Sequence, residues 1–430
     1  MTSQRHIRLR HEELFVDLVG QTNRRRGWIV VVICFVALSF TFASRSSISM
    51  VLPIWATELG WSATEVSTGA SLVLVMMALG SPIAGNFLDR FGAKAILTSG
   101  LLALGLGIGA TSYVSETLFY YLLFGIIGGV GWASVSIPMV TAAVSNYFVK
   151  FRGLAIGIGV SGASGGQLPV LTLLGAMIAA LGWRQSYQVL AVVMFVLATL
   201  VYLCFRPPLK EPNQRKTAET AVENDGLVSR LSFLFANQTF LLLLGAFSLC
   251  GFTTAGVIDV YFIPYAITCG FTLVEGSAAY GIHGLGNLAG VILFSWLADH
   301  VNRPRLLASM FFFRAITFIL LLFISIDISV MFVFAAIFGV LNFATFPVIA
   351  NIVATHIGVR IIGLTLGLLF GGHSLGAAIG VVFGGLMFDL TAKYEFVWWL
   401  SAGLAAMAGV FAIFVKETRL PPVKDVLTDA

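Results

Sequence analysis

The sequence contains very little charge. Asp, Glu, Lys and Arg make up only 10% of its 430 residues, whereas about 25% is usual in a soluble domain. Hydrophobic residues account for 58%. This composition excludes an ordinary soluble domain and indicates an integral membrane protein.

Cysteine is scarce as well. Cys34, Cys204, Cys250 and Cys269 are scattered without metal-ligand spacing, so they predict neither a zinc site nor a disulfide framework. The sequence also lacks a nucleophile triad, a phosphate-binding loop and an ATP-binding domain. We therefore expect no enzyme, no metal and no cofactor.

The apolar residues are grouped in long runs. A helix needs about 20 residues to cross the hydrocarbon core of a bilayer, whereas the strands of a membrane barrel are alternating segments of about ten residues. The pattern therefore predicts an all-α polytopic protein with twelve transmembrane helices. The runs lie near 28–54, 66–87, 95–114, 118–146, 153–181, 186–205, 239–266, 276–298, 306–326, 329–352, 360–388 and 396–416.

The basic residues are unevenly distributed between the two sides. Most of the 25 Lys and Arg residues lie in the tails and in the loops of one side, while the loops of the opposite side hold Arg184 and Lys393. Cytoplasmic loops carry such an excess. We expect both termini in the cytoplasm, with the protein in the cytoplasmic membrane, and no nucleic-acid partner is needed to explain the basic charge.

An internal repeat divides the chain. An offset of 210 residues (270 minus 60) pairs Gly60 with Gly270, and the same offset serves both ends of the halves. Further pairs are Glu65/Glu275, Ser67/Ser277, Gly80/Gly290, Asp89/Asp299, Gly153/Gly363, Leu154/Leu364, Gly157/Gly367, Ser164/Ser374, Gly166/Gly376 and Gly175/Gly385. Such self-similarity predicts a duplicated six-helix unit, with a substrate site between the halves near mid-bilayer.

These observations predict five segments. They are a cytoplasmic tail (1–27), a first bundle (28–206), a cytoplasmic central loop (207–238), a second bundle (239–416) and a cytoplasmic tail (417–430). The tails and the loop are too short for the output domain of a sensor.

The loop between the second and third runs carries a motif. Gly85-Asn86-Phe87-Leu88-Asp89-Arg90-Phe91-Gly92-Ala93-Lys94 resembles the cytoplasmic loop motif of the major facilitator superfamily, and a degenerate copy follows run 8 around Asp299. The resemblance covers nearly the whole chain. It implies the fold of these transporters, and a gating role for Gly85, Asp89, Arg90, Gly92, Lys94, Arg152 and Asp299.

A second resemblance concerns the branch of the superfamily. Gly27-Trp28-Ile29-Val30 and the segment from Gly371 to Gly380 look like the monocarboxylate and oxalate:formate carriers. The monocarboxylate carriers place a basic residue in helix 1 where Arg45 aligns, which implies an organic anion as substrate. Their acidic and basic pair in helix 8 aligns here with Asn287 and Val291, so the resemblance stops short of that pair.

Five ionisable residues lie inside predicted spans: Arg45, Asp259, His283, Arg314 and His373. Charged groups at the bilayer centre are costly and are usually functional. Side chains of a helix lean toward its N-terminus, so Arg45 points toward mid-bilayer, and the neighbouring serines suggest a wet helix face. Arg45 is expected to bind substrate or to form a structural ion pair. Arg314, in a peripheral helix of the family, is expected to be structural.

The offset relates the two strongest candidates. Asp259 corresponds to Ser49, one helical turn beyond Arg45, so we expect the two charges to face each other and to pair when the site is empty, or permanently. His283, with Asn287 one turn deeper, and His373 could titrate near neutral pH or serve only in packing.

The leading hypothesis is a secondary transporter of a small organic anion, most simply a monocarboxylate, that works as a monomer by alternating access with proton symport. Arg45, Asn287 and His373 would bind the substrate, and Asp259 or His283 would carry the proton. The alternative is an exporter of a hydrophobic or amphipathic compound.

Overall fold

The computed structural model describes residues 25–145, 147–148, 152–205, 227–323, 327–357 and 361–416. Twelve helical segments in these ranges are long and apolar enough to span a membrane. The structure therefore confirms the predicted all-helical fold.

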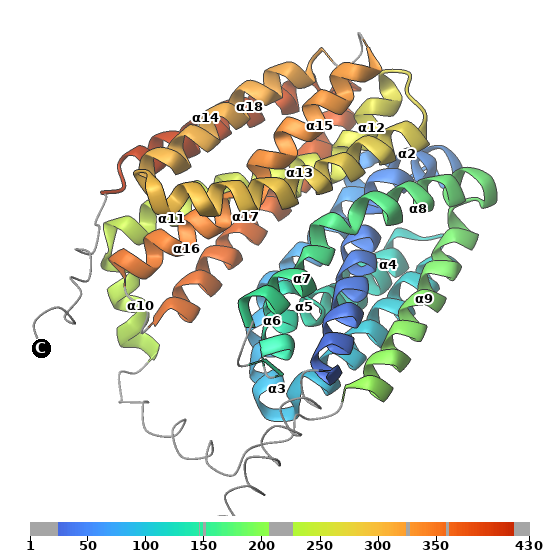
Figure 1. Cartoon of the computed structure of the whole chain (residues 1–430). Helices are drawn as coiled ribbons and strands as arrows, with labels where there is room; N and C mark the ends of the chain where they lie inside the picture. Colours follow the sequence, from blue (N-terminus) through green and yellow to red (C-terminus); the bar gives the residue numbers. More distant parts are fainter. Residues whose placement is uncertain are drawn as a thin grey trace, which may run out of the picture.

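The first six spans form one bundle (Figure 1). They comprise a helix over 25–46, α2 (Ile48–Glu58), α3 (Ala63–Thr111), α4 (Thr117–Tyr120), the π-helix η1 (Tyr121–Gly128), α5 (Gly129–Ser134), α6 (Ile137–Ser145), α7 (Arg152–Gly165), α8 (Gln167–Leu181) and α9 (Trp183–Cys204). Spans 2 and 3 both lie in α3, where Gly92 adopts a φ of 80°. A positive φ is freely available only to glycine, so the predicted loop of the motif is a sharp kink within one helix.

The last six spans form the second bundle. They comprise α11 (Gln238–Gly251), the π-helix η2 (Phe252–Ile258), α12 (Asp259–Thr268), α13 (Leu273–His300), α14 (Arg303–Leu321), α15 (Ile328–Asn342), α16 (Thr345–His356), α17 (Ile362–Thr391) and α18 (Glu395–Ile413). A further helix, α10 (Leu227–Ala236), lies in the segment predicted as central loop. Its Leu234 is fully buried against the second bundle, which explains why this short piece is helical.

The helices begin at ordinary capping signals. The Ser62 hydroxyl accepts from the Glu65 N–H while the Glu65 carboxylate accepts from the Ser62 N–H, and Thr272 and Glu275 form the same capping box at α13. A capping box satisfies N–H groups that the first turn leaves free. The two boxes are 210 residues apart, so the repeat extends to the helix ends.

The two bundles meet through glycines related by the repeat. A Cβ on Gly175 of α8 would lie 2.5 Å from the Ser277 hydroxyl oxygen, and one on Gly385 of α17 would lie 2.6 Å from that of Ser67. Small residues allow this close approach of helices. Each contact therefore joins one half to the other at the predicted outer side.

Farther along the same helices the packing changes. At Gly157 of α7 and Gly367 of α17 nothing lies within 4 Å of where a Cβ would be. These two glycines are again 210 residues apart. In Figure 1 the ribbons of the bundles come together near α2 and α12 and lie apart near α6 and α10. Among the described residues, the close glycine contacts at Gly175 and Gly385 therefore lie at the predicted outer side, and Gly157 and Gly367 lack such contacts.

Candidate functional site

The site lies where the first span is interrupted. The helix over 25–46 ends one residue after Arg45, Ser47 forms a turn, and α2 begins at Ile48. The Ser47 hydroxyl donates to the Ser44 carbonyl (2.7 Å) and lies 2.9 Å from the Tyr187 hydroxyl. These bonds fix the turn, and Arg45 with it, to the first bundle.

Asp259 is positioned by a different irregularity. It is the first residue of α12 and directly follows the π-helical segment η2. A π-helix closes its hydrogen bonds one residue farther along the chain than an α-helix, and such segments are frequent at functional sites. Here the segment delivers the carboxylate to the interface between the bundles.

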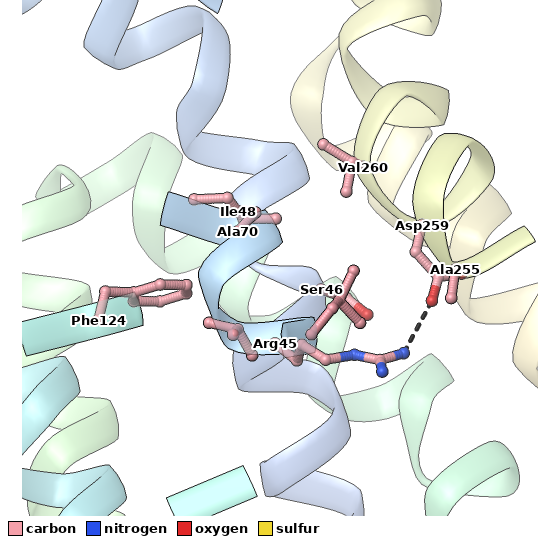
Figure 2. A pocket seen from close by; sticks show the side chains of 10 residues that line it. Arg45, Ser46, Ile48, Ala70, Phe124, Ala255, Asp259 and Val260 are labelled. Atoms are coloured by element: carbon pink, nitrogen blue, oxygen red, sulfur yellow. Dashed lines mark hydrogen bonds and ion pairs between the residues drawn. The ribbon is translucent and has the colours of Figure 1, made fainter. Parts of the chain in front are cut away.

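Arg45 and Asp259 form an ion pair across the two halves. Arg45 Nη2 lies 2.8 Å from Asp259 Oδ2, and Figure 2 shows the guanidinium reaching from its helix toward the carboxylate. The side chains are 17% and 10% exposed. The pairing expected from the repeat offset is therefore present in the structure.

The other carboxylate oxygen has a partner of its own. The hydroxyl of Tyr280 in α13 donates to Asp259 Oδ1 at 2.6 Å, and Tyr280 is 1% exposed. Asp259 thus accepts one hydrogen bond from each half of the molecule. Sequence reasoning missed Tyr280, although it shares a helix face with His283 and Asn287 at spacings of three and seven residues.

A small pocket adjoins the ion pair (Figure 2). Its lining consists of Arg45, Ser46, Ile48, Ala70, Val73, Leu74, Phe124, Ala255, Asp259 and Val260. Arg45 and Asp259 are the charged residues of this lining, and the space admits about one or two water molecules. A larger guest therefore requires the pair to separate or the halves to move.

The serines around Arg45 differ from the expected wet face. Ser44, Ser46, Ser47 and Ser49 are all at most 2% exposed. The Ser44 hydroxyl donates to the Thr41 carbonyl at 2.7 Å. Of the four, only Ser46 lines the pocket. The Ser44 and Ser47 hydroxyls instead lie against Trp132 and Tyr187 of the first bundle.

The predicted histidine and asparagine sites lie apart from the pocket lining. His283 is buried, with Nε2 3.1 Å from Asn342 Nδ2, and Asn287 Oδ1 accepts from the Phe343 N–H at 3.2 Å. Both contacts hold the break between α15 and α16. The His373 ring packs 4.6 Å from that of Phe247. Among the described residues, none of these three side chains forms a hydrogen bond to Arg45 or Asp259 in this conformation.

Comparison with known proteins decides the class. The family model for the Major Facilitator Superfamily matches residues 34–364 and 285–428. The chain belongs to the Major Facilitator Superfamily. It is therefore a membrane transporter of small molecules, not an enzyme.

Several relatives within the superfamily are similar over most of their length. The MFS-type transporter YcxA of Bacillus subtilis (strain 168) is 26% identical over 383 residues, which cover 87% of this chain and 91% of that protein. Human monocarboxylate transporter 11 is 26% identical over 412 residues, which cover 92% and 84%.

Solved superfamily structures share the fold. A bacterial homologue of the human lysosomal transporter Spinster, solved in an inward-facing, unoccupied conformation, matches with a TM-score of 0.72 at 16% identity over 91% of this chain and 97% of that one. A D-xylose–proton symporter matches with a TM-score of 0.69 at 14% identity over 90% and 96%.

The superfamily motif is only partly described. Gly92 makes the kink noted above, and Lys94 Nζ lies 4.0 Å from the centre of the Tyr202 ring. The side chains of Asp89, Arg90, Arg152 and Asp299 and the surroundings of Gly85 lie outside the described part of the structure. Their gating role stays a prediction.

Proposed function

We propose that the protein is a proton-coupled symporter of small monocarboxylates, located in the cytoplasmic membrane with both termini in the cytoplasm. The observation that carries the proposal is the ion pair between Arg45 and Asp259 across the two halves, beside a pocket. The name of the human relative, monocarboxylate transporter 11, supports the substrate class.

Arg45 has the chemistry to bind the substrate. A guanidinium presents a planar set of donors that matches a carboxylate and stays charged in proteins. In the structure Asp259 accepts from this donor set at 2.8 Å. An arriving monocarboxylate offers Arg45 the same kind of partner, so substrate and Asp259 compete for one cation.

Charge balance then calls for a proton. With the site empty, one positive and one negative charge cancel. A bound carboxylate adds a second negative charge in a region where uncompensated charge is expensive. Protonation of Asp259 restores neutrality, because losing a cationic neighbour favours the protonated form of a buried carboxyl. One proton would accompany each monocarboxylate.

The packing supports alternating access. The bundles close tightly at Gly175 and Gly385 but not at Gly157 and Gly367. A rocking motion about the central pair would expose the pocket first to one side and then to the other. Direct substrate contact by Asn287 and His373, proton transfer by His283 and action as a monomer remain predictions that accompany this proposal.

The experiment is uptake by purified protein in proteoliposomes. The panel contains lactate, pyruvate, acetate, oxalate and amino acids, each with and without an imposed pH gradient. We expect uptake of at least one monocarboxylate that rises when the gradient is imposed. Transport of hydrophobic drugs with no carboxylate transported would contradict the proposal and favour an amphipathic-compound exporter.

Substitution at Arg45 tests the site itself. Arg45→Gln should reduce carboxylate uptake at least a hundredfold, whereas Arg184→Gln, at an exposed pair with Glu58, should leave it unchanged. Removing one partner of a buried pair also leaves an uncompensated charge. The double variant Arg45→Gln with Asp259→Asn removes both charges, so it should accumulate normally and still be inactive. Normal uptake by a folded Arg45→Gln protein would refute the role of Arg45.

A further inference from the structure

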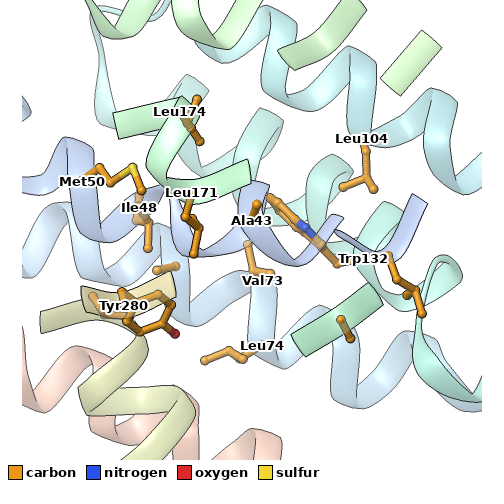
Figure 3. Close-up of a cluster of buried hydrophobic side chains, with 14 of the residues drawn as sticks. Ala43, Ile48, Met50, Val73, Leu74, Leu104, Trp132, Leu171, Leu174 and Tyr280 are labelled. Atoms are coloured by element: carbon orange, nitrogen blue, oxygen red, sulfur yellow. The ribbon is translucent and has the colours of Figure 1, made fainter. Parts of the chain in front are cut away.

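Tyr280 is a buried polar residue that has no role in the transport steps proposed above. It lies on α13 and is only 1% exposed, in a buried apolar cluster with Ile48 and Leu171 of the first bundle (Figure 3). Its hydroxyl donates a hydrogen bond to Asp259 Oδ1 at 2.6 Å. A bond of this length from a hydroxyl to a carboxylate is a strong, charge-assisted hydrogen bond.

The two oxygens of Asp259 are therefore not equivalent. Oδ1 accepts from Tyr280, on the same half, and Oδ2 accepts from Arg45, on the other half. Movement of the halves, or capture of Arg45 by a carboxylate, frees Oδ2. The bond to Oδ1 stays, because α12 and α13 belong to one bundle.

The groups around Asp259 limit which side chains could exchange a proton with its carboxylate. Among the described residues, the charged and titratable groups that face it are Arg45 from the first span, and Tyr280 and His283 from α13. The ring of His373 in α17 packs against Phe247 and Phe370. His283 Nε2 accepts from the Asn342 amide N–H, so this nitrogen is already engaged.

We propose, on the basis of the proposed symport, that Tyr280 is a positioning residue for Asp259: it holds Oδ1 so that the carboxylate gains and loses its proton at Oδ2, on the pocket side. In the loading step a proton that arrives from the aqueous side as hydronium adds to Oδ2 as the Arg45 N–H leaves it, and water returns to the solvent. Arg45 keeps all its protons and transfers its hydrogen bonds to the substrate carboxylate. The step consumes one proton and leaves the site neutral.

The first test is the pH profile of Tyr280→Phe. The tyrosine hydroxyl donates to the ionised carboxylate, and a donor of this kind favours the charged form. Without it the ionised carboxylate loses this hydrogen bond. The midpoint of the pH dependence of uptake should move upward by about one unit, a tenfold change in proton occupancy at a given pH, with the KM for substrate changed less than threefold.

The matched control is Tyr120→Phe. Tyr120 is also completely buried, but its hydroxyl donates to the Val66 carbonyl in the first bundle. This variant should keep the midpoint of the parent. An equal shift in both variants would show a general effect of removing a buried phenol and would overturn the proposal.

A second readout needs no substrate. Infrared difference spectra recorded across the titration should contain the carbonyl band of protonated Asp259, identified by its loss in Asp259→Asn. In Tyr280→Phe the band should move to higher wavenumber, since Oδ1 no longer accepts a hydrogen bond. An unmoved band would refute the role of Tyr280 even if the protein carried no monocarboxylate.

If Tyr280→Phe does not fold, a fluorinated tyrosine at position 280 keeps the shape and makes the hydroxyl a stronger donor. The midpoint should then move to lower pH. A wild-type protein that shows proton-coupled uptake while neither variant shifts the midpoint would overturn the Tyr280 proposal and leave the symport proposal standing.

Discussion

At the scale of single residues, two arginines in the membrane show opposite environments. Arg45 is paired with a carboxylate and lines a pocket. Arg314 has 0% exposure, and its donors go to the Cys250 sulfur at 2.8 Å and to the carbonyls of Leu341 and Asn342. Those carbonyls lie at the C-terminal end of α15, where the helix dipole favours a cation. Arg314 therefore fixes the break between α15 and α16, as expected of a structural residue.

Replacement of Arg314 should consequently reduce stability more than substrate affinity. Arg314→Met leaves buried carbonyls without donors, at a cost of about 1–3 kcal/mol for each unsatisfied group. The thermal unfolding midpoint in detergent should fall by several degrees, with an unchanged KM for any folded fraction. Arg184→Met, at the exposed pair with Glu58, is the control and should unfold as the wild type does. A normal midpoint for Arg314→Met would contradict the structural role.

The sequence predicted the ion pair between Arg45 and Asp259 but not the hydrogen bond from Tyr280 to Asp259. The offset of 210 residues placed Asp259 one turn from the counterpart of Arg45, because duplicated halves carry equivalent helices to equivalent depths. Tyr280 could not be found in this way, since its repeat counterpart is Ala70 and only tertiary packing brings it to Asp259. The serines expected to form a wet face are buried instead. Ser44 and Ser47 donate to carbonyls three residues earlier in the chain, as short hydroxyl side chains commonly do.

At the scale of helices, α17 and α3 are joined by a carboxylate. Asp389 near the end of α17 accepts from the N–H groups of Ala63 and Thr64 at the start of α3, each at 2.8 Å. Negative charge is favoured at a helix N-terminus. The repeat counterpart of Asp389 is Ala179, so the other seam between the halves lacks this contact. Opening the outer side must break it.

Removal of this contact should favour the outward-open form. Asp389→Ala loses about 1 kcal/mol of helix-end stabilisation, enough for about a fivefold shift between conformations. The readout is labelling of Ala70→Cys by an impermeant maleimide from the outer side, in a protein whose four native cysteines are replaced. The rate should rise about fivefold. The matched control is Asp327→Ala. Asp327 also caps a helix, α15, but within one bundle, so this variant should not change the labelling rate.

Equal labelling of both variants would show that Asp389 does not hold the outer side closed.

Irregular helical segments are the elements that the sequence predicted least well. The lengths of the apolar runs were enough to predict the twelve spans. The residue pattern did not predict the π-helical segments η1 and η2, because packing between helices determines them.

At the scale of the whole molecule, two equivalent bundles enclose one asymmetric site. The first bundle supplies the cation, and the second supplies the carboxylate and the phenol that holds it. The glycine pairs show both seams closed at the predicted outer side. In the proposed mechanism the site is neutral both without and with its substrate, so the halves would move without carrying net charge through the membrane.

The most direct test of this account separates the chemical from the electrical driving force in proteoliposomes that contain the wild-type protein. An imposed pH gradient should drive accumulation of a monocarboxylate, and a membrane potential imposed without a pH gradient should drive none, because one proton and one carboxylate move together without net charge. In Asp259→Asn the pH gradient should no longer drive accumulation. Accumulation driven by the potential alone, or by the pH gradient in Asp259→Asn, would contradict the account.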